Sequence, residues 1–339
     1  MIIVRAPLRI SFVGGGTDLS DFYRVSPGRV ISTAINHYVY VAVNRTPLMK
    51  KVSARYSLGE MVDHPRELKN DRIREALLDL GIEHSIEIGT FSHLPGHTGL
   101  GSSSAFSVAL MRGLYAAQGK NMDKHGIAEA ACRLEIDLVG DPIGKQDQYA
   151  AALGGFNVLE FRPDESVTVD PVMLDYQRRR EFENHLLLFF SGIHRKAASV
   201  LTEQKANTAQ NREILQAMAD SVFEFKDRLM EGDFEGLGMM LQSAWERKKL
   251  LSSNVSNSVI NRLYEAGISA GAWGGKILGA GGGGCLLLLA PPERHQAIRD
   301  TLKKRAAELA LHDFQELPVK FAHSGVEVMI NSDHSRMMA

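Results

Sequence analysis

The sequence has little of what marks several large classes of protein. It contains two cysteines, so a framework of several disulfides is excluded and a reducing compartment is expected. Its formal net charge of −1 gives no overall attraction to nucleic acid or to an anionic membrane, and we expect neither as a partner. The longest apolar run, residues 285–290, is far short of the roughly 20 residues that a membrane span needs. Arg5 and Arg9 interrupt the apolar N-terminal stretch, which is unlike a signal peptide. We therefore expect a cytoplasmic protein.

Two common nucleotide-binding motifs are also missing. No G-x-x-x-x-G-K-[ST] segment occurs, so a Walker-type P-loop is excluded. Residues 279–284 (GAGGGG) match G-x-G-x-x-G, but the apolar run that follows indicates a strand, whereas the dinucleotide fingerprint requires a helix there. A glycine run between two strands indicates a tight loop that approaches a neighbouring segment or a ligand. Close strand packing without a ligand stays open as the alternative.

The chain of 339 residues is long enough for one large domain or two moderate ones. The patterns of apolar residues predict a mixed first half and a mostly helical stretch from about residue 196 to residue 266. The charge cluster at residues 178–181 (RRRE) precedes an apolar strand at 185–190 and is the best candidate for a boundary. We therefore predict an α+β protein with domains at 1–180 and 181–339.

One glycine-rich segment, residues 94–105 (LPGHTGLGSSSA), lies between a predicted strand at 85–92 and a predicted helix at 102–117. Glycines let a backbone pass close to a ligand, and the free N–H groups of a helix start suit a polyphosphate. The serine hydroxyls are placed where a metal ion that bridges phosphates could be held. A capped helix after a glycine turn would give the same pattern without any ligand.

Two further segments resolve this ambiguity, residues 5–18 (RAPLRISFVGGGTD) and 276–285 (KILGAGGGGC). Together with residues 95–105 they resemble, in order, the three motifs of the GHMP kinases, which include galactokinase, homoserine kinase and mevalonate kinase. The resemblance implies a two-domain α+β fold with the active site in the cleft between the domains. It also implies ATP as the phosphate donor, Mg²⁺, and phosphate contacts from Pro95, Gly99, Leu100, Gly101, Ser102, Ser103 and Ser104.

An acidic residue for the metal is found on the predicted helix at 124–139. Glu135 has apolar neighbours, which favours partial burial, although a helical Glu is usually a solvated residue. In the resembled family, a Glu five residues before a Gly-x-Pro turn ligates Mg²⁺ together with a loop serine. Residues 140–142 (GDP) supply the turn, and Ser103 best matches the serine.

The catalytic pair is implied by residues 144–149 (GKQDQY), which resemble the galactokinase segment that holds the catalytic aspartate. Asp147 carries over as the base that receives the hydroxyl proton. An Asp in the first turn of a helix would also be explained by the helix dipole. In galactokinase-like members an arginine of the first motif faces this aspartate, and Arg9 has that position. A cation there favours the ionised carboxylate.

The acceptor is implied by the end of the first motif. In the sugar kinases its Thr-Asp pair, here Thr17 and Asp18, meets sugar hydroxyls, and a carboxylate offers several acceptor sites for them. Galactokinases have Gly-Glu-His where this chain has three glycines at 14–16, which leaves more room for a sugar other than galactose. In the third motif, Gly281 and Gly282 are expected to border the acceptor.

Three segments, at residues 14–18, 190–195 and 274–280, look most like the D-glycero-D-manno-heptose 7-phosphate kinase branch of the family. That branch phosphorylates the anomeric hydroxyl on the way to nucleotide-activated heptose for surface polysaccharide. Lys145, residues 194–196 (HRK, with Arg195 first among them) and residues 247–249 (RKK) are candidates to hold a remote phosphate, although any single Lys or Arg can be an ordinary surface charge. The expected partner is a small-molecule sugar phosphate.

Three alternatives stay open at this point. The L-fucose kinases share much of the pattern. A catalytically silent sensor of ATP and sugar would be expected to lose the base or its cation, and Asp147, Arg9, Glu135 and Ser103 are all present. A decarboxylase that phosphorylates transiently is disfavoured by the Thr17-Asp18 pair, which suits a polyol.

Overall fold

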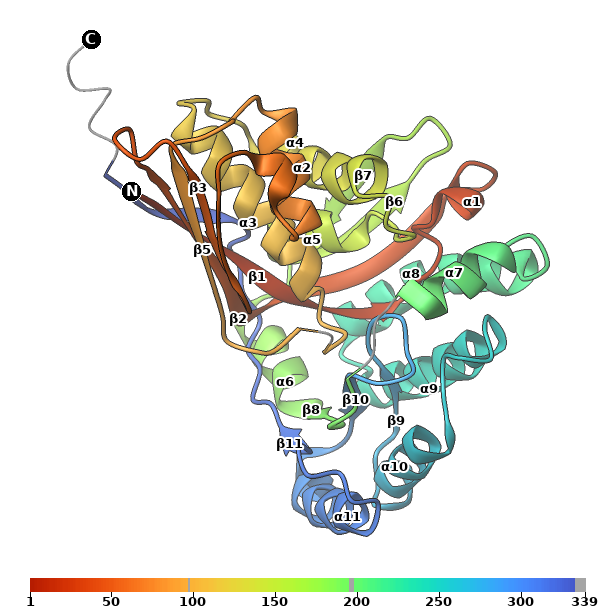
Figure 1. The fold of residues 1–339 in the computed structure, drawn as a ribbon. Helices are drawn as coiled ribbons and strands as arrows, with labels where there is room; N and C mark the ends of the chain where they lie inside the picture. Colours follow the sequence, from red (N-terminus) through yellow and green to blue (C-terminus); the bar gives the residue numbers. More distant parts are fainter. Residues whose placement is uncertain (97, 195–197, 333–339) are drawn as a thin grey trace.

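Two β-sheets, one large and one small, organise the structure, which is a computed structural model that describes residues 1–96, 98–194 and 198–332 (Figure 1). Within these residues the large sheet has eight strands: β1 (Ile2–Val13), β2 (Gly28–Arg45), β3 (Val52–Arg55), β4 (Gly59–Val62), β5 (Ile86–Ser92), β6 (Phe156–Phe161), β7 (Val167–Pro171) and β12 (Glu327–Asn331). The small sheet has four: β8 (Leu186–Phe190), β9 (Gly274–Ile277), β10 (Cys285–Leu289) and β11 (Gln315–Glu316). The predicted α+β class is confirmed.

The centre of the large sheet is the antiparallel pair of β1 and β2. β2 is long enough to pair with β6 along its first part and with β5 along its last part. The register of β1 and β2 shifts next to Pro7, as expected where a proline interrupts a ladder. Because side chains alternate along a strand, Arg9 and Ser11 share one face of β1, and both line the main cavity.

Helices cover the large sheet and carry much of the site (Figure 1). Those that pack on β1 or β2 are α3 (Ser102–Ala117), α5 (Gln146–Leu153), α8 (Arg212–Glu231) and α9 (Phe234–Leu250). The Phe12 ring of β1 lies 5.3 Å from both the Phe182 and the Phe225 rings, so aromatic packing ties the strand to two later helices. Shorter helices are α1 (Ser20–Tyr23), α2 (Asp71–Asp79), α4 (Lys124–Cys132), α6 (Tyr176–His185) and α7 (Ala198–Ala206).

The small sheet has the most apolar strands of the chain. Every residue of β8 (LLLFF) and β10 (CLLLL) is buried, as continuous apolar runs predict for strands covered on both faces. Its neighbours are α9, α10 (Ser258–Ser269) and α11 (His295–Glu308). α9 approaches β9 very closely, because a Cβ on Gly274 would lie 1.9 Å from the Gly238 carbonyl oxygen. Only glycines permit this contact, and it brings α9 and β9 together beside the site.

Four expectations about elements need correction. The charge cluster at 178–181 lies inside α6, a helix that is capped by Asp175 and whose buried residues, Phe182 and Glu183, follow the cluster directly. Residues 319–323 (VKFAH), for which the sequence also predicts a strand, form one isolated bridge, from Phe321 to Ile35. The helix predicted at 124–139 ends as α4 at Cys132 and continues as a π-helical segment, η2 (Arg133–Leu138). The stretch from residue 196 contains a break between α7 and α8.

Two simpler expectations can be compared with the structure. Cys132 and Cys285 are both buried free thiols. None of the helices within residues 1–96, 98–194 and 198–332 is both long and apolar enough to cross a membrane.

Candidate active site

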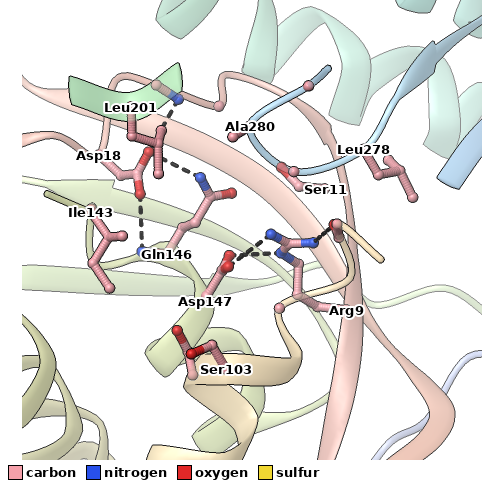
Figure 2. A pocket seen from close by; sticks show the side chains of 18 of the residues that line it. Arg9, Ser11, Asp18, Ser103, Ile143, Gln146, Asp147, Leu201, Leu278 and Ala280 are labelled. Atoms are coloured by element: carbon pink, nitrogen blue, oxygen red, sulfur yellow. Dashed lines mark hydrogen bonds and ion pairs between the residues drawn. The ribbon is translucent and has the colours of Figure 1, made fainter. Parts of the chain in front are cut away.

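A cavity of about 450 Å³ lies where the two sheets face each other, and segments from both halves of the chain line it. The large-sheet side contributes β1, the turn after it, and the starts of α3 and α5. The small-sheet side contributes α9, β9 and the glycine loop that follows β9. Figure 2 shows the polar side chains of the first group gathered in this cavity. Its volume is ordinary for a small-molecule site.

Arg9 and Asp147 form a bidentate ion pair in the cavity (Figure 2). Nε and Nη2 of Arg9 donate to the two carboxylate oxygens of Asp147 at 2.7 and 2.8 Å. The third arm, Nη1, donates to the carbonyl oxygen of Gly99 at 2.7 Å. Arg9 is only 3% exposed, so its guanidinium is fixed by these contacts. The predicted pair is therefore brought together, and Asp147 is oriented by a buried cation.

The glycine–serine loop, residues 98–104, crosses directly over this pair and leads into α3. Gly99 and Gly101 have φ angles of 79° and 76°, a conformation that favours glycine. The Arg9 backbone N–H donates to the Leu100 carbonyl at 3.0 Å, which anchors the loop on β1. Ser102, Ser103 and Ser104 line the cavity at the start of α3, where backbone N–H groups have no partner within the helix. Within the loop, the Leu100 side chain is buried. Pro95, which precedes the loop, lies on the surface.

The third glycine segment packs against this loop. A Cβ on Gly279 would lie 2.7 Å from the Cα of Gly99, and the Cys285 N–H donates to the Thr98 carbonyl at 2.9 Å. Gly281 lines the cavity, whereas the Gly282 N–H is used by the Val255 carbonyl. The glycine run therefore approaches a neighbouring segment, as predicted, and that segment is the second motif.

Asp18 belongs to the turn after β1. Its side chain lies beside the start of α5, the helix that carries Asp147. Its two oxygens accept from the backbone N–H of Gln146 at 3.2 Å and from the Gln146 side chain at 3.0 Å (Figure 2). A Cβ on Gly144 would lie 2.0 Å from an Asp18 oxygen, so a glycine is required there. Burial raises the pKa of Asp18, and the Asp147 carboxylate raises it further. Thr17 is fully buried, and its hydroxyl holds the turn through the Gly14 and Arg29 carbonyls.

The two predicted metal ligands are placed differently. Ser103 faces the cavity, whereas Glu135 is fully buried on the π-helical segment η2. Its carboxylate accepts from Arg72 Nε at 2.9 Å and from Gln148 Nε2 at 2.7 Å. Arg72, which lines the cavity, also pairs with Asp141. A hydroxyl and a carboxylate are donors that suit Mg²⁺, but Arg72 competes with any ion for Glu135.

Of the cations predicted to hold a remote phosphate, Lys248 lines this cavity and Lys145 does not. Lys145 pairs with Glu165 at 2.5 Å and lines a second cavity of about 390 Å³, which adjoins the first at Asp18 and Ile143. Arg195 lies outside the described residues.

Sequence reasoning missed two cations that line the main cavity, Arg72 and Lys276. Lys276 opens the third motif, and Lys248 lies in a run of charges on α9 that has the pattern of a solvated helix end. Both are buried. The only signal for Lys276 is its position in a predicted strand. For Lys248 the signal is the run of charges at 247–249, which does not distinguish it from its two neighbours.

Comparison with known proteins gives matches in both halves of the chain. Residues 70–155 match the family model "GHMP kinases N terminal domain", and residues 225–308 match "GHMP kinases C terminal". The chain is similar to the D-glycero-alpha-D-manno-heptose 7-phosphate kinase of Campylobacter jejuni, with 27% identity over 94% of this chain and 98% of the relative.

Two further relatives show how far the similarity extends. A bifunctional fucokinase/GDP-fucose pyrophosphorylase of Arabidopsis thaliana is 27% identical over 89% of this chain, which spans 31% of that protein. Among solved structures, a D-glycero-D-manno-heptose 1-phosphate kinase from Bacteroides thetaiotaomicron superposes with a TM-score of 0.79 at 23% identity, over 98% of this chain and 99% of that one. This last likeness supports the fold.

Proposed function

The chain belongs to the GHMP kinases, and within this family of sugar and small-molecule kinases we propose that it phosphorylates the anomeric hydroxyl of D-glycero-D-manno-heptose 7-phosphate. The donor is ATP and the products are the 1,7-bisphosphate and ADP. In this proposal the product serves the synthesis of nucleotide-activated heptose for surface polysaccharide.

Asp147 is the base of the proposed reaction. The acceptor oxygen attacks the γ-phosphorus of ATP, the bond from that phosphorus to the β–γ bridging oxygen breaks, and the hydroxyl proton goes to Asp147. The bidentate contact with Arg9 at 2.7 and 2.8 Å supports this assignment, because it orients the carboxylate beside the start of α3. Arg9 also fixes the Gly99 carbonyl, so the base and the loop are held by one side chain.

The glycine–serine loop binds the triphosphate in this proposal. Free N–H groups at the start of a 16-residue helix favour an anion there. Ser103 and Glu135 are the residues that would hold Mg²⁺, which when bound would neutralise phosphate charge. Binding of the ion at Glu135 requires that Arg72 gives up its contact with that carboxylate.

The single observation that carries the choice of acceptor is the open space beside Asp18. Both carboxylate oxygens of Asp18 accept hydrogen bonds from Gln146, which fixes the orientation of the carboxylate. A fixed acceptor group suits the binding of sugar hydroxyls. Gly15 adds no side chain, and the nearest atoms to a Cβ there, Gln146 Nε2 and Ser11 Oγ, are both 3.8 Å away. The cavity can therefore take a sugar with a longer chain at the end remote from the reacting hydroxyl. The full-length similarity to a heptose 7-phosphate kinase supports the same choice.

A kinase assay over a matched panel tests the proposal. The panel contains the heptose 7-phosphate, the free heptose, L-fucose and D-galactose, with ADP release as the readout. We expect the highest kcat/KM for the heptose 7-phosphate and a ³¹P signal of an anomeric phosphate in the product. A clear preference for L-fucose would replace the proposal with fucose kinase activity, and ³¹P coupling to a different carbon would refute the position.

A further inference from the structure

Two buried lysines face the main cavity without a carboxylate partner. Lys248 of α9 and Lys276 of β9 are 6% and 5% exposed. Lys248 donates to the Gly279 carbonyl, and Lys276 donates to the carbonyls of Ser11 and Phe12 at 3.2 and 2.7 Å. Within the described part of the chain, no carboxylate oxygen is close enough to form an ion pair with either lysine. The other two cations of the cavity, Arg9 and Arg72, are both paired.

An unpaired buried ammonium group is costly, so this arrangement calls for an anion. Burial lowers the pKa of Lys248 to about 8, and Arg9 contributes to the shift. Burial also lowers the pKa of Lys276 well below its usual value, with further contributions from Lys248 and Arg9. The lysines therefore repel each other, and a bound dianion would offset both the repulsion and the loss of water.

Ser11 supplies an independent sign of a ligand at the same place. Its hydroxyl lines the cavity, the residue is 5% exposed, and its Oγ has no hydrogen-bond partner among the described residues. Ser11 lies two residues after Arg9 on the same face of β1. The Lys276 ammonium group donates a hydrogen bond to the Ser11 carbonyl oxygen. Beside it is the space at Gly15, where a Cβ would lie 3.8 Å from the Ser11 Oγ.

We propose that Ser11, Lys248 and Lys276 form a subsite for the phosphate that the acceptor already carries. This inference rests on the proposed function. The triphosphate has its own place at the start of α3, next to Ser103 and Asp147. Ser11 lies beside Gly15, and Lys276 donates to the Ser11 and Phe12 carbonyls just before the Gly14–Gly16 turn that leads to Asp18, at the acceptor end of the cavity. Lys248 interacts electrostatically with both Lys276 and Asp18. Lysine ammonium groups and a hydroxyl donor match the oxygens of a phosphate monoester.

The experiment compares kcat/KM for a heptose 7-phosphate with kcat/KM for the same heptose without phosphate. Lys248→Met and Lys276→Met should each lower the ratio of the two values about 10–100-fold, since a charge-assisted contact to one substrate is lost. Ser11→Ala should lower it about three- to tenfold. Lys249→Met is the matched control: Lys249 is the next residue on α9 and pairs with Glu246 at the surface.

A substitution at Gly15 tests the same subsite without removing any lysine. The φ angle of Gly15 is not in the left-handed region, so a side chain can be added there. Gly15→Glu should direct a carboxylate toward the lysines and abolish the preference for the sugar phosphate, whereas Gly15→Ala should keep it.

The outcomes separate the subsite from the proposed function. Wild-type enzyme that shows no preference for the sugar phosphate overturns both. A wild-type preference that survives Lys248→Met, Lys276→Met, Ser11→Ala and Gly15→Glu overturns the subsite alone. Equal losses on both substrates also overturn it, because they would assign the lysines to the transferred phosphoryl group. If a lysine variant does not fold, the Ser11 and Gly15 variants still decide.

Discussion

At the scale of single residues, the contacts of Asp147 decide what it can do. Both of its oxygens meet Arg9, and its side chain is still 24% exposed to the cavity. Asp147→Asn keeps the shape but loses the proton acceptor, so kcat should fall about 10²–10⁴-fold. ATP affinity, measured by calorimetry, should change little. A variant that keeps most of the wild-type kcat would remove Asp147 from the role of base.

Substitutions at Glu135 and at Arg72 should change the Mg²⁺ requirement in opposite directions. Arg72 Nε holds a Glu135 oxygen at 2.9 Å and so competes with Mg²⁺. Glu135→Gln should raise the Mg²⁺ concentration for half-maximal velocity, and Arg72→Met should lower it. Losing a group that contacts a metal ligand typically changes metal affinity about 10–100-fold, and shifts of that order are expected. If the Mg²⁺ titration is unchanged in both variants, the Arg72–Glu135 ion pair has a structural role and does not take part in metal binding.

The pH dependence of kcat/KM for the sugar phosphate should reflect the ionisation of Lys248. The charged groups that face it are Arg9 of β1, Asp18 after β1, Asp147 of α5 and Lys276 of β9. Because the pKa of Lys248 is lowered to about 8, the lysine is charged below that pH and neutral above it. A sugar phosphate is a dianion on both sides of this step, since its second pKa is about 6. Hence kcat/KM for the sugar phosphate should fall as pH rises through about 8.

The Lys248→Met profile is the control for this prediction. It should lack the step near pH 8, and the profile for the free sugar should lack it in the wild type as well. A step of the same size with both acceptors would assign the titration to a group of the transfer reaction.

The residues that sequence could predict are those whose role follows from local spacing. Arg9, Asp18, Ser103 and Asp147 stand at fixed places in short motifs, and the structure brings them to one cavity. The roles proposed for Lys276 and Ser11 could not be predicted in this way. Their significance depends on what is absent around them, a carboxylate or a hydrogen-bond partner, and that becomes visible only when distant segments are packed together.

At the scale of elements, the start of α5 places both carboxylates of the site. Asp147 lies in its first turn, and the backbone N–H of Gln146 holds Asp18. The positive end of the helix favours this arrangement. The order of elements around α5 was predictable from apolar periodicity, whereas the π-helical segment η2 that carries Glu135 was not, because so short a segment cannot set a period of its own in the sequence.

The glycine–serine loop gives a prediction at this scale. A Cβ at Gly101 would lie 3.3 Å from Arg9 Cγ and 3.4 Å from Asp147 Oδ2, at a φ of 76°. Gly101→Val should therefore lower ATP affinity at least about tenfold by calorimetry, through crowding added to backbone strain of about 1–2 kcal/mol. Gly81→Val is the control, because it has a φ of 65° and nothing within 4 Å of its Cβ. Equal ATP affinities for the two variants would contradict the role of the loop.

At the scale of the whole molecule, the chain does not divide at one point. β12 follows the entire small sheet in sequence but pairs with β1, and Arg5 of β1 binds Glu327 of β12 at 2.7 Å. Domains at 1–180 and 181–339 therefore stay a proposal about the two sheets, with the final strand returning to the first. Sequence could not predict this return, because an antiparallel partner at the far end of the chain leaves no local pattern.

The contact between the two sheets leads to the last prediction. Gly279 belongs to the small-sheet side and Gly99 to the large-sheet side, and a Cβ on Gly279 would lie 2.7 Å from the Gly99 Cα. Gly279→Ala should push the glycine–serine loop away, weaken ATP binding and raise amide hydrogen exchange in residues 98–104. Gly155→Ala is the control: its φ of 70° matches the 69° of Gly279, but the nearest atom to its Cβ is 3.6 Å away.

Both variants carry the same backbone strain of roughly 1 kcal/mol, and Gly279→Ala should show the larger drop in Tm because its Cβ also meets the Gly99 backbone at 2.7 Å. Only Gly279→Ala should lose ATP affinity, because only there does the added methyl group meet backbone of the opposite sheet. If the two variants lose ATP affinity equally, the small sheet does not support the loop, and the third motif would act on the acceptor alone. If Gly279→Ala loses ATP affinity by itself, the two halves of the chain share one phosphate site.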